Sequence, residues 1–303
     1  MALMQLASVS RWFGNVVAVN DVSMSIGPGV TGLLGPNGAG KSTLIAMMSG
    51  FLPPSAGTVT LDGAPVWRRE QVYRQIGIVP EREAMYDVVT GWTFVLTNAS
   101  LHGLADPGAA ATRAIETVER TDAAQREVST YTKGMKQRIK MAAALVHDPA
   151  VLLLDEPFNG MDPRQRLHLM DLLVTMGREG RTVLFSSHIL EEVEQVAGTI
   201  EVMVAGRHAA SGDFHEIRRL MTERPHMYTV TSSDDRALAA AALADGAVSA
   251  GERVEGQVRL QAGDSMRFGT SLPRLARAAG IRLYDVTPAD ESLESVFAYL
   301  VGR

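Results

Sequence analysis

GPNGAGKST, residues 35 to 43, fits the pattern G-x-x-x-x-G-K-[S/T] through Gly35, Gly40, Lys41 and Ser42. A strand-like run, VTGLL, precedes this segment, and a helical run that begins KSTLIAMM overlaps its end. In such a loop the glycines let backbone N–H groups point at phosphate oxygens, and the helix N-terminus adds a positive dipole. The segment therefore predicts a strand, a loop and a helix that together bind a nucleoside triphosphate.

Each residue of this phosphate loop is a candidate nucleotide-binding position. Lys41 can place its charge on the β- and γ-phosphates, and Ser42 can offer a hydroxyl to Mg²⁺, which prefers oxygen ligands. The loop by itself identifies neither the nucleotide nor the use made of it. The candidate residues are Gly35, Pro36, Asn37, Gly38, Ala39, Gly40, Lys41, Ser42 and Thr43.

Strand-like and helical runs alternate on both sides of the loop. The runs VLLLDEP and TVLFSSH are continuously apolar before their polar ends, as expected of parallel strands buried on both faces. This alternation predicts an α/β fold with a mostly parallel core sheet, interrupted by a helical insert over about 83–146. Strands are predicted at 3–10, 16–26, 29–35, 57–63 with a turn at Asp62–Gly63, 76–80, 151–157 and 182–188, and a strand pair is predicted at 199–212.

The composition of the chain changes near residue 215. We expect a nucleotide-binding domain over 1–215 and a small α+β accessory domain over 216–303, beginning with a linking helix at 216–225. Within the accessory domain, strands are predicted at 227–232, 257–263 and 281–287, with helices at 234–246 and 271–280 between them. A final helix is predicted from the apolar spacing of Leu293, Val296, Phe297 and Leu300.

Two acids, Asp155 and Glu156, end the run VLLLDEP. Ligands of open α/β sheets bind at this carboxyl edge, where one acid can hold a water of the Mg²⁺ shell and another can polarise an attacking water. Solvated acids at a strand end are the alternative, and the phosphate loop favours the functional interpretation. His188, at the end of the next apolar strand, is either a γ-phosphate contact or a structural residue.

The overall composition limits the classes of function. The chain has 303 residues, a formal net charge of −5 and no cysteine, so a generally basic footprint for nucleic acid is absent and disulfides are excluded. No apolar run approaches the roughly 18 to 20 residues that span a bilayer. We therefore expect a cytoplasmic protein that binds no nucleic acid and whose contact with a membrane comes through a partner.

The order of motifs resembles the ATP-binding subunit of an ATP-binding-cassette (ABC) transporter. The resemblance is carried by GPNGAGKST, YTKGMKQR, VLLLDEP, NGMD and the histidine of SSH, and it is nearest to single-cassette subunits of bacterial exporters with a separate permease. It implies a P-loop NTPase cassette with ATP and Mg²⁺ as cofactors. It also implies a homodimer or heterodimer of ABC subunits around two ATP molecules, bound to a transmembrane permease at the cytoplasmic face of the membrane.

The resemblance assigns roles to individual residues. Glu156 matches the general base, Asp155 the Mg²⁺-linked acid and His188 the switch histidine, while Asp162 of NGMD matches the loop that couples the two sites. Phe13 matches the aromatic residue that stacks on adenine. Trp12 is a possible substitute for it, and a buried structural aromatic is the alternative.

Two positions depart from the family pattern. Glu81 stands where the family usually has glutamine, a neutral ligand of Mg²⁺ and water. As a charged residue, Glu81 could bind Mg²⁺ more tightly or slow hydrolysis by repulsion. In the signature motif, usually L-S-G-G-Q, Thr132 keeps a hydroxyl and Gly134 keeps the second glycine, but Lys133 replaces the first. Thr132 and Gly134 are expected to complete the ATP site of the opposite subunit.

The main hypothesis from sequence is an ATPase that powers an export permease. The helical insert would pass the motion to the permease, through apolar residues that could instead form the insert's own core: Tyr86, Val88, Val89, Trp92 and Phe94. The alternative hypothesis is an ABC-type ATPase that acts on nucleic acid or ribosomes. The single cassette, the acidic balance and the absence of cysteine weigh against it.

Overall fold

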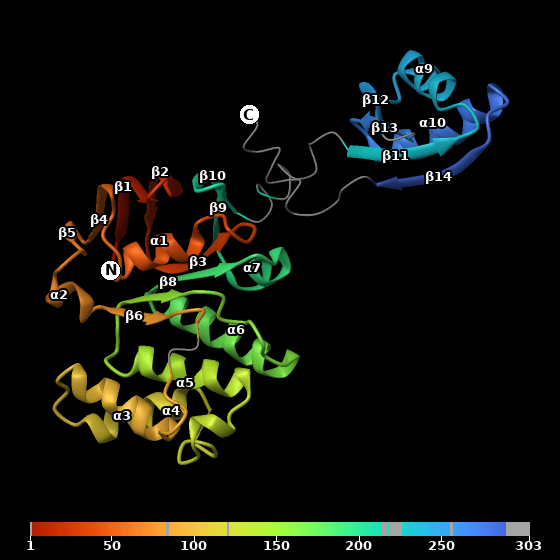
Figure 1. The fold of residues 1–303 in the computed structure, drawn as a ribbon. Coiled ribbons are helices and arrows are strands. Elements are labelled where there is room, and N and C mark those ends of the chain that lie inside the picture. Colours follow the sequence, from red (N-terminus) through yellow and green to blue (C-terminus); the bar gives the residue numbers. More distant parts are fainter. Residues whose placement is uncertain are drawn as a thin grey trace. The chain divides into compact units, whose positions relative to one another are not determined.

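A computed structural model describes residues 2–82, 85–119, 121–213, 217, 226–254 and 257–288. The chain separates into two compact units, Met1–Phe214 and His215–Arg303, and each is described here by itself (Figure 1). The predicted linking helix at 216–225 lies outside the described residues except at Ile217. The predicted terminal helix with Leu293, Val296, Phe297 and Leu300 lies entirely outside them.

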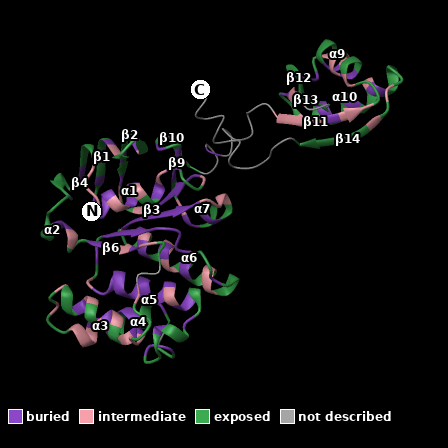
Figure 2. Cartoon of the chain, in the orientation of Figure 1, coloured by how far each residue is buried: buried purple, intermediate pink, exposed green. Residues whose placement is uncertain are grey.

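A six-stranded sheet forms the centre of the first unit, with the strand order β10-β9-β3-β8-β7-β6. Every neighbouring pair is parallel except β9 and β10, so the predicted mostly parallel core sheet is confirmed. All residues of β7 and β8 are buried, which explains their continuously apolar sequences (Figure 2). The strands are β3 (Gly29–Leu34), β6 (Ile76–Val79), β7 (Val151–Leu154), β8 (Thr182–Ser187), β9 (Thr199–Val204) and β10 (Arg207–Gly212).

A second, antiparallel sheet of the order β2-β1-β4-β5 belongs to the same unit. The strands predicted at 3–10, 16–26 and 57–63 lie in this sheet rather than in the parallel one. Leu61 pairs with Ala64 across the turn at Asp62–Gly63, and Asp62 Oδ1 accepts a hydrogen bond of 2.8 Å from the backbone of Leu3. The strands are β1 (Met4–Phe13), β2 (Val16–Ile26), β4 (Ala56–Leu61) and β5 (Ala64–Pro65).

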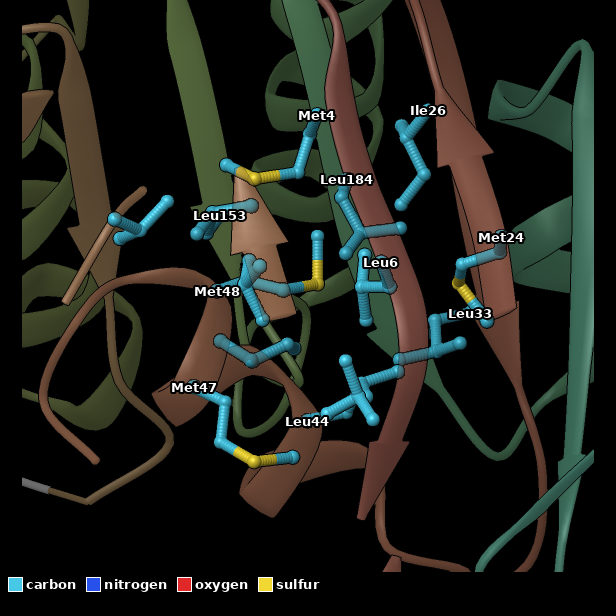
Figure 3. Packing of buried hydrophobic residues seen from close by; sticks show 14 of the residues in the cluster. Met4, Leu6, Met24, Ile26, Leu33, Leu44, Met47, Met48, Leu153 and Leu184 are labelled. Atoms are coloured by element: carbon cyan, nitrogen blue, oxygen red, sulfur yellow. The ribbon is translucent and has the colours of Figure 1, made fainter. Parts of the chain in front are cut away.

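Helix α1 (Lys41–Met48) packs against both sheets. Leu44 and Met48 of this helix share one buried cluster with Met4 of β1 and Leu184 of β8 (Figure 3). Because the phosphate loop leads directly into α1, this core fixes the position of the loop. The other helices of this part are α2 (Glu70–Tyr73), α6 (Pro163–Arg178) and α7 (Leu190–Val196).

The helical insert contains α3 (Gly91–Leu101), α4 (Pro107–Thr117), the 3-10 turn η1 (Val128–Thr130) and α5 (Lys133–Leu145). Thr90, Asp106 and Thr132 cap the three α-helices by accepting hydrogen bonds from backbone N–H groups of the first turns. Helix α5 contacts α3, α4 and β6, so it joins the insert to the parallel sheet. Within 83–146, residues 83, 84 and 120 lie outside the described residues.

The second unit is a two-layer α+β structure whose sheet has the order β12-β13-β11-β14. Its element order, strand-helix-strand-strand-helix-strand, is that of a split β-α-β fold. β12 was not predicted, because AGERV lacks apolar alternation, and α10 begins six residues before its predicted start at 271. The elements are β11 (His226–Ser232), α9 (Asp235–Asp245), β12 (Ala250–Val254), β13 (Gln257–Ala262), α10 (Ser265–Ala278) and β14 (Leu283–Pro288).

Candidate functional site

The phosphate loop connects β3 to α1, as predicted. A Cβ atom at Gly35 would meet the carbonyl oxygen of Met203, and one at Gly40 would meet that of Ala18. Gly40 also has a φ of +96°, which L side chains rarely adopt. Glycine at these two positions is therefore required by close backbone contacts as well as by the curl of the loop.

Lys41 is the buried cation of the loop, with 6% of its side chain exposed. Its Nζ donates hydrogen bonds of 2.6 Å to the Gly35 carbonyl and 3.2 Å to the Pro36 carbonyl. It also lies 3.5 Å from Glu156 Oε1. Burial lowers the pKa of Lys41, and the attraction of Glu156 opposes that change. The ammonium group is thus held beside the loop carbonyls and the acid at the end of β7.

Asp155 and Glu156 follow β7 directly, and one buried hydroxyl contacts both of them. Ser186 Oγ donates a hydrogen bond of 2.7 Å to Asp155 Oδ1 and accepts one of 2.9 Å from the backbone N–H of Glu156. Glu156 has a φ of +47°, in the left-handed region. Ser186 was not predicted from the sequence, because the parallel pairing of β8 with β7 that brings it to these acids is visible only in the structure.

His188 contacts the same glutamate. Its Nδ1 lies 3.0 Å from Glu156 Oε2, and the imidazole is 38% exposed whereas the carboxyl is 7% exposed. With an ionised carboxylate, Nδ1 must carry the proton in this hydrogen bond, since the carboxylate only accepts. Burial raises the pKa of Glu156, while Lys41 and His188 oppose the rise. The structure thus brings Lys41, Glu156 and His188 together.

A cleft of about 450 Å³ lies along the phosphate loop. Glu81, after β6, and Glu156, after β7, line this cleft together with residues of the loop. Two of the three predicted catalytic residues thus share one space with Lys41, whereas His188 is not among the lining residues. The lining residues are Val16, Val17, Ala18, Asn37, Gly38, Ala39, Gly40, Lys41, Ser42, Thr43, Glu81 and Glu156.

The two aromatic candidates for adenine stacking lie on β1. Phe13 is 47% exposed and Trp12 is 42% exposed, so neither is a core residue. The Arg11 guanidinium lies 4.7 Å from the centre of the Phe13 ring. Phe13 pairs with Val16, which lines the cleft, but Phe13 itself is not among the lining residues.

Three of the candidate residues offer oxygen atoms to a cation. Ser42 and Glu81 line the cleft, and Asp155 is 5% exposed and oriented by Ser186. Among the described residues no group of three or more histidines, cysteines and acids is arranged to hold a metal by itself. The available hydroxyl and carboxylates are the donor types that Mg²⁺ accepts alongside phosphate oxygens and water, so these residues fit the ion.

The signature residues lie away from this cleft, at the N-terminus of α5. Thr132 Oγ1 accepts a hydrogen bond of 3.3 Å from the Met135 N–H, as an N-cap. Gly134 is buried, and a Cβ there would meet the side chain of Gln165 on α6. Asp162 caps α6 by accepting 3.0 Å from the Gln165 N–H. Within one chain the signature therefore packs against the NGMD segment, a contact that sequence reasoning did not predict.

No described helix is both long and apolar enough to cross a membrane. In the segment suggested for permease docking, Tyr86 and Val88 are exposed, at 76% and 84%. Val89, Trp92 and Phe94 are half-buried.

Comparisons with known proteins agree with this arrangement. A family model described as ABC transporter matches residues 19–159. The chain is 33% identical to the linearmycin resistance ATP-binding protein LnrL of Bacillus subtilis (strain 168), with 99% of each chain covered. It is 34% identical to the daunorubicin resistance ATP-binding protein DrrA3 of Streptomyces coeruleorubidus, over 96% of this chain and 93% of that one. A solved structure described as the ATP-binding subunit of an ABC transporter matches with a TM-score of 0.65 and 26% identity, over 72% of this chain and 92% of that chain.

Proposed function

The chain belongs to the ABC transporter family as an ATP-binding ATPase subunit, and on that premise we propose that it powers export through a separate transmembrane permease. The observation that carries the ATPase role in this proposal is that residues of the phosphate loop, Glu81 and Glu156 line the same cleft. Support for export comes from relatives named for drug resistance, for bacitracin transport and for Nod factor export. Through the permease, the chain would lie at the cytoplasmic face of the membrane.

In the proposed mechanism Glu156 is the general base. Its carboxylate polarises a water molecule for in-line attack on the γ-phosphate, and the hydrogen bond from His188 orients that carboxylate. Lys41 moves its ammonium from the loop carbonyls to the phosphate oxygens of ATP. Ser42, Asp155 and Glu81 would hold Mg²⁺, which would neutralise part of the negative charge of the phosphates. The displacement needs no covalent bond to the protein, so positioning is the contribution of these residues.

The proposal includes a dimer that closes around two ATP molecules. Thr132, Gly134 and Asp162 do not line the cleft that contains Lys41. They gather at the N-termini of α5 and α6, where backbone N–H groups and a hydroxyl can contact an anion. Their contribution to ATP binding would therefore be made to the cleft of a second ABC subunit, either an identical chain or a different one.

The helical insert is the proposed contact with the permease. Exposed Tyr86 and Val88 lie just before α3, and Phe94 on that helix lines a small cleft with Phe51 and Pro80. Pro80 directly precedes Glu81, so a partner seated there would touch the segment that carries a catalytic candidate. This arrangement would connect ATP hydrolysis to movement of the permease.

Hydrolysis by the purified chain and by Glu156→Gln tests the proposal. The wild-type chain should hydrolyse ATP with Mg²⁺, whereas Glu156→Gln should bind ATP, lose roughly 10²-fold or more of the rate and accumulate as an ATP-dependent dimer. Glu194→Gln, the same change at an exposed position on α7, should behave like the wild type. Full activity of Glu156→Gln would refute the role of the base, and an ATP-bound variant that stays monomeric would refute the dimer.

A further inference from the structure

A second cleft, of about 370 Å³, adjoins the nucleotide cleft. Glu81 and Glu156 line both clefts and so form the boundary between them. The other side of the second cleft is one face of α5. Its lining residues are Glu81, Lys133, Lys136, Gln137, Lys140, Glu156, Asn159 and Gly160.

The use of lysine in this chain is confined to these two clefts. Lysine and arginine together number 29, yet the sequence contains lysine only at Lys41, Lys133, Lys136 and Lys140. The last three are spaced i, i+3 and i+7, which places them on one face of α5. Every other residue of the lysine and arginine total is arginine. Outside the phosphate loop, compact ammonium groups therefore occur only on the face of α5 that borders Glu81 and Glu156.

The most buried of these lysines holds the backbone around Glu81. Lys140 is 5% exposed, and its Nζ donates 2.7 Å to the Pro80 carbonyl and lies 3.5 Å from the Arg82 carbonyl. These two carbonyls flank Glu81 on both sides. An ammonium group can direct its donors to separate acceptors, whereas a guanidinium group is larger and has its donors fixed in one plane. Lys140 is therefore suited to fix the position of Glu81.

The other two lysines bring charge to the same cleft. Lys136 Nζ lies 3.5 Å from Asp87 Oδ1. Lys133 packs its side chain against Gly160 of the NGMD segment. Both positions at which the chain departs from the family pattern, Glu81 and Lys133, therefore line one cleft.

We propose that Lys133, Lys136 and Lys140 form a compensating lysine face, in which Lys133 and Lys136 balance the charge of Glu81 and Lys140 holds its backbone in place beside the nucleotide. This inference rests on the proposed function and extends it. A carboxylate near the phosphates of ATP would repel them, and neighbouring ammonium groups offset that repulsion. The lysine face therefore lets the chain carry glutamate at a position where glutamine is expected.

A double-mutant cycle between Lys133 and Glu81 tests the charge balance. We expect Lys133→Met to raise the dissociation constant for ATP roughly fivefold when residue 81 is glutamate, and less than about twofold in the Glu81→Gln background. Raising the salt concentration should reduce the effect, since exposed charges are screened. Arg113→Met removes an exposed charge from α4 of the same insert and should change neither value.

Lys133→Arg separates charge from packing, since it keeps the charge. It should bind ATP like the wild type if charge is the cause. An equal loss in Lys133→Arg and Lys133→Met, or an equal effect of Lys133→Met in both backgrounds at residue 81, would overturn the proposal. A wild-type chain that binds and hydrolyses no ATP would instead remove the proposed function itself.

Lys140 acts as a positioning residue in this scheme, so its removal should have a different signature. Lys140→Met is expected to lower kcat roughly tenfold in both backgrounds at residue 81, because the contact with the Pro80 carbonyl does not depend on the charge of residue 81. KM for ATP should change less than kcat. An unchanged kcat, or full rescue by Glu81→Gln, would contradict the positioning role.

Discussion

At the scale of single residues, the left-handed backbone of Glu156 is the feature that most needs an explanation. A φ of +47° at a residue other than glycine costs of order 1 to 3 kcal/mol, and it persists only where neighbouring groups hold it in place. The hydroxyl of Ser186 accepts from the Glu156 N–H and donates to Asp155, and Ser186 is fully buried. The strain is thus located at the carboxylate that lines the nucleotide cleft, and a buried serine near the end of β8 holds this residue and the adjacent Asp155 in place.

A second residue-scale feature is a pair of stacked imidazoles between the insert and the parallel sheet. The rings of His102 and His147 lie 3.7 Å apart and nearly parallel. His147 Nε2 contacts the Ile76 carbonyl at 3.2 Å and must donate, while His147 Nδ1 is buried with no partner among the described residues. Burial, with the nearby His102, lowers the pKa of His147 from 6.5 to about 4. The folded chain therefore keeps this ring neutral.

This pKa predicts how stability depends on pH. From pH 6.5 down to about 4 the unfolded chain binds a proton at His147 that the folded chain does not, so stability falls as the pH falls. His147→Gln should remove that loss and raise the free energy of unfolding more at about pH 5 than at about pH 7.5. Urea denaturation of the wild type and the variant at these two pH values measures the change in the free energy of unfolding. An equal change at the two pH values would contradict the assignment.

His208 provides a control of opposite sign. Its hydrogen bond of 2.6 Å to Glu201 raises its pKa above the ordinary value of 6.5. The stability it contributes is complete below pH 6.5 and is lost as the pH rises through the raised value. His208→Gln should therefore lower the free energy of unfolding more at about pH 5 than at alkaline pH.

At the scale of helices and strands, local pattern predicted the elements that are long or strongly apolar. β7 and β8 are apolar throughout because they are buried on both faces, and the phosphate loop joins β3 to α1 as its glycines indicate. β12 was missed because its sequence, AGERV, is polar and small and it pairs at the sheet edge. The division into two sheets also depends on long-range pairing, which short windows of sequence do not contain.

The same limit applies to the candidate site. Motifs identified Lys41, Glu156 and His188, which do meet, because each stands at a strand end or loop of the parallel sheet. Ser186 and Lys140 carry no motif of their own, since a serine in a strand and a lysine in a helix are ordinary residues. Their importance comes from contacts across elements: β8 to β7 for Ser186, and α5 to the segment after β6 for Lys140.

The start of α5 offers a prediction at the element scale. Gly134→Asp should leave ATP binding by one chain within about twofold of the wild type, since Gly134 lies outside the nucleotide cleft, and should abolish ATP-driven dimerisation and hydrolysis. The new side chain also meets Gln165 of the same chain, so a loss of roughly 1 to 3 kcal/mol of stability is expected. Equilibrium denaturation, nucleotide binding and size-exclusion chromatography with ATP measure the three effects.

Gln165→Ala distinguishes the two consequences of that substitution. In the Gly134→Asp background it opens space within the chain, so stability should recover while hydrolysis stays lost. Recovery of hydrolysis together with stability would mean that Gly134 acts through packing on α6 and not through a second subunit.

At the scale of the whole molecule, the two units have separate hydrophobic cores. The first unit builds its core from α1 and both of its sheets, whereas the second packs α9 and α10 on its own antiparallel sheet. Phe268 of α10 is 2% exposed and stacks on Tyr228 of β11 with 4.2 Å between ring centres. Every described residue that lines the nucleotide cleft belongs to the first unit. Damage to the second core should therefore leave the chemistry of the first unit intact.

Phe268→Ala in the full chain tests this separation. Removing a buried aromatic ring should cost the second unit roughly 3 to 5 kcal/mol, which lowers or removes its own transition in a calorimetric scan. ATP binding and hydrolysis should stay within about twofold of the wild type, because the first core loses no contact. Met266→Ala, on the same helix but at a position 81% exposed, should change neither the scan nor the activity. If Phe268→Ala abolished hydrolysis while Met266→Ala did not, a folded second unit would be required for ATP hydrolysis, and the two units would have to be treated as one functional body.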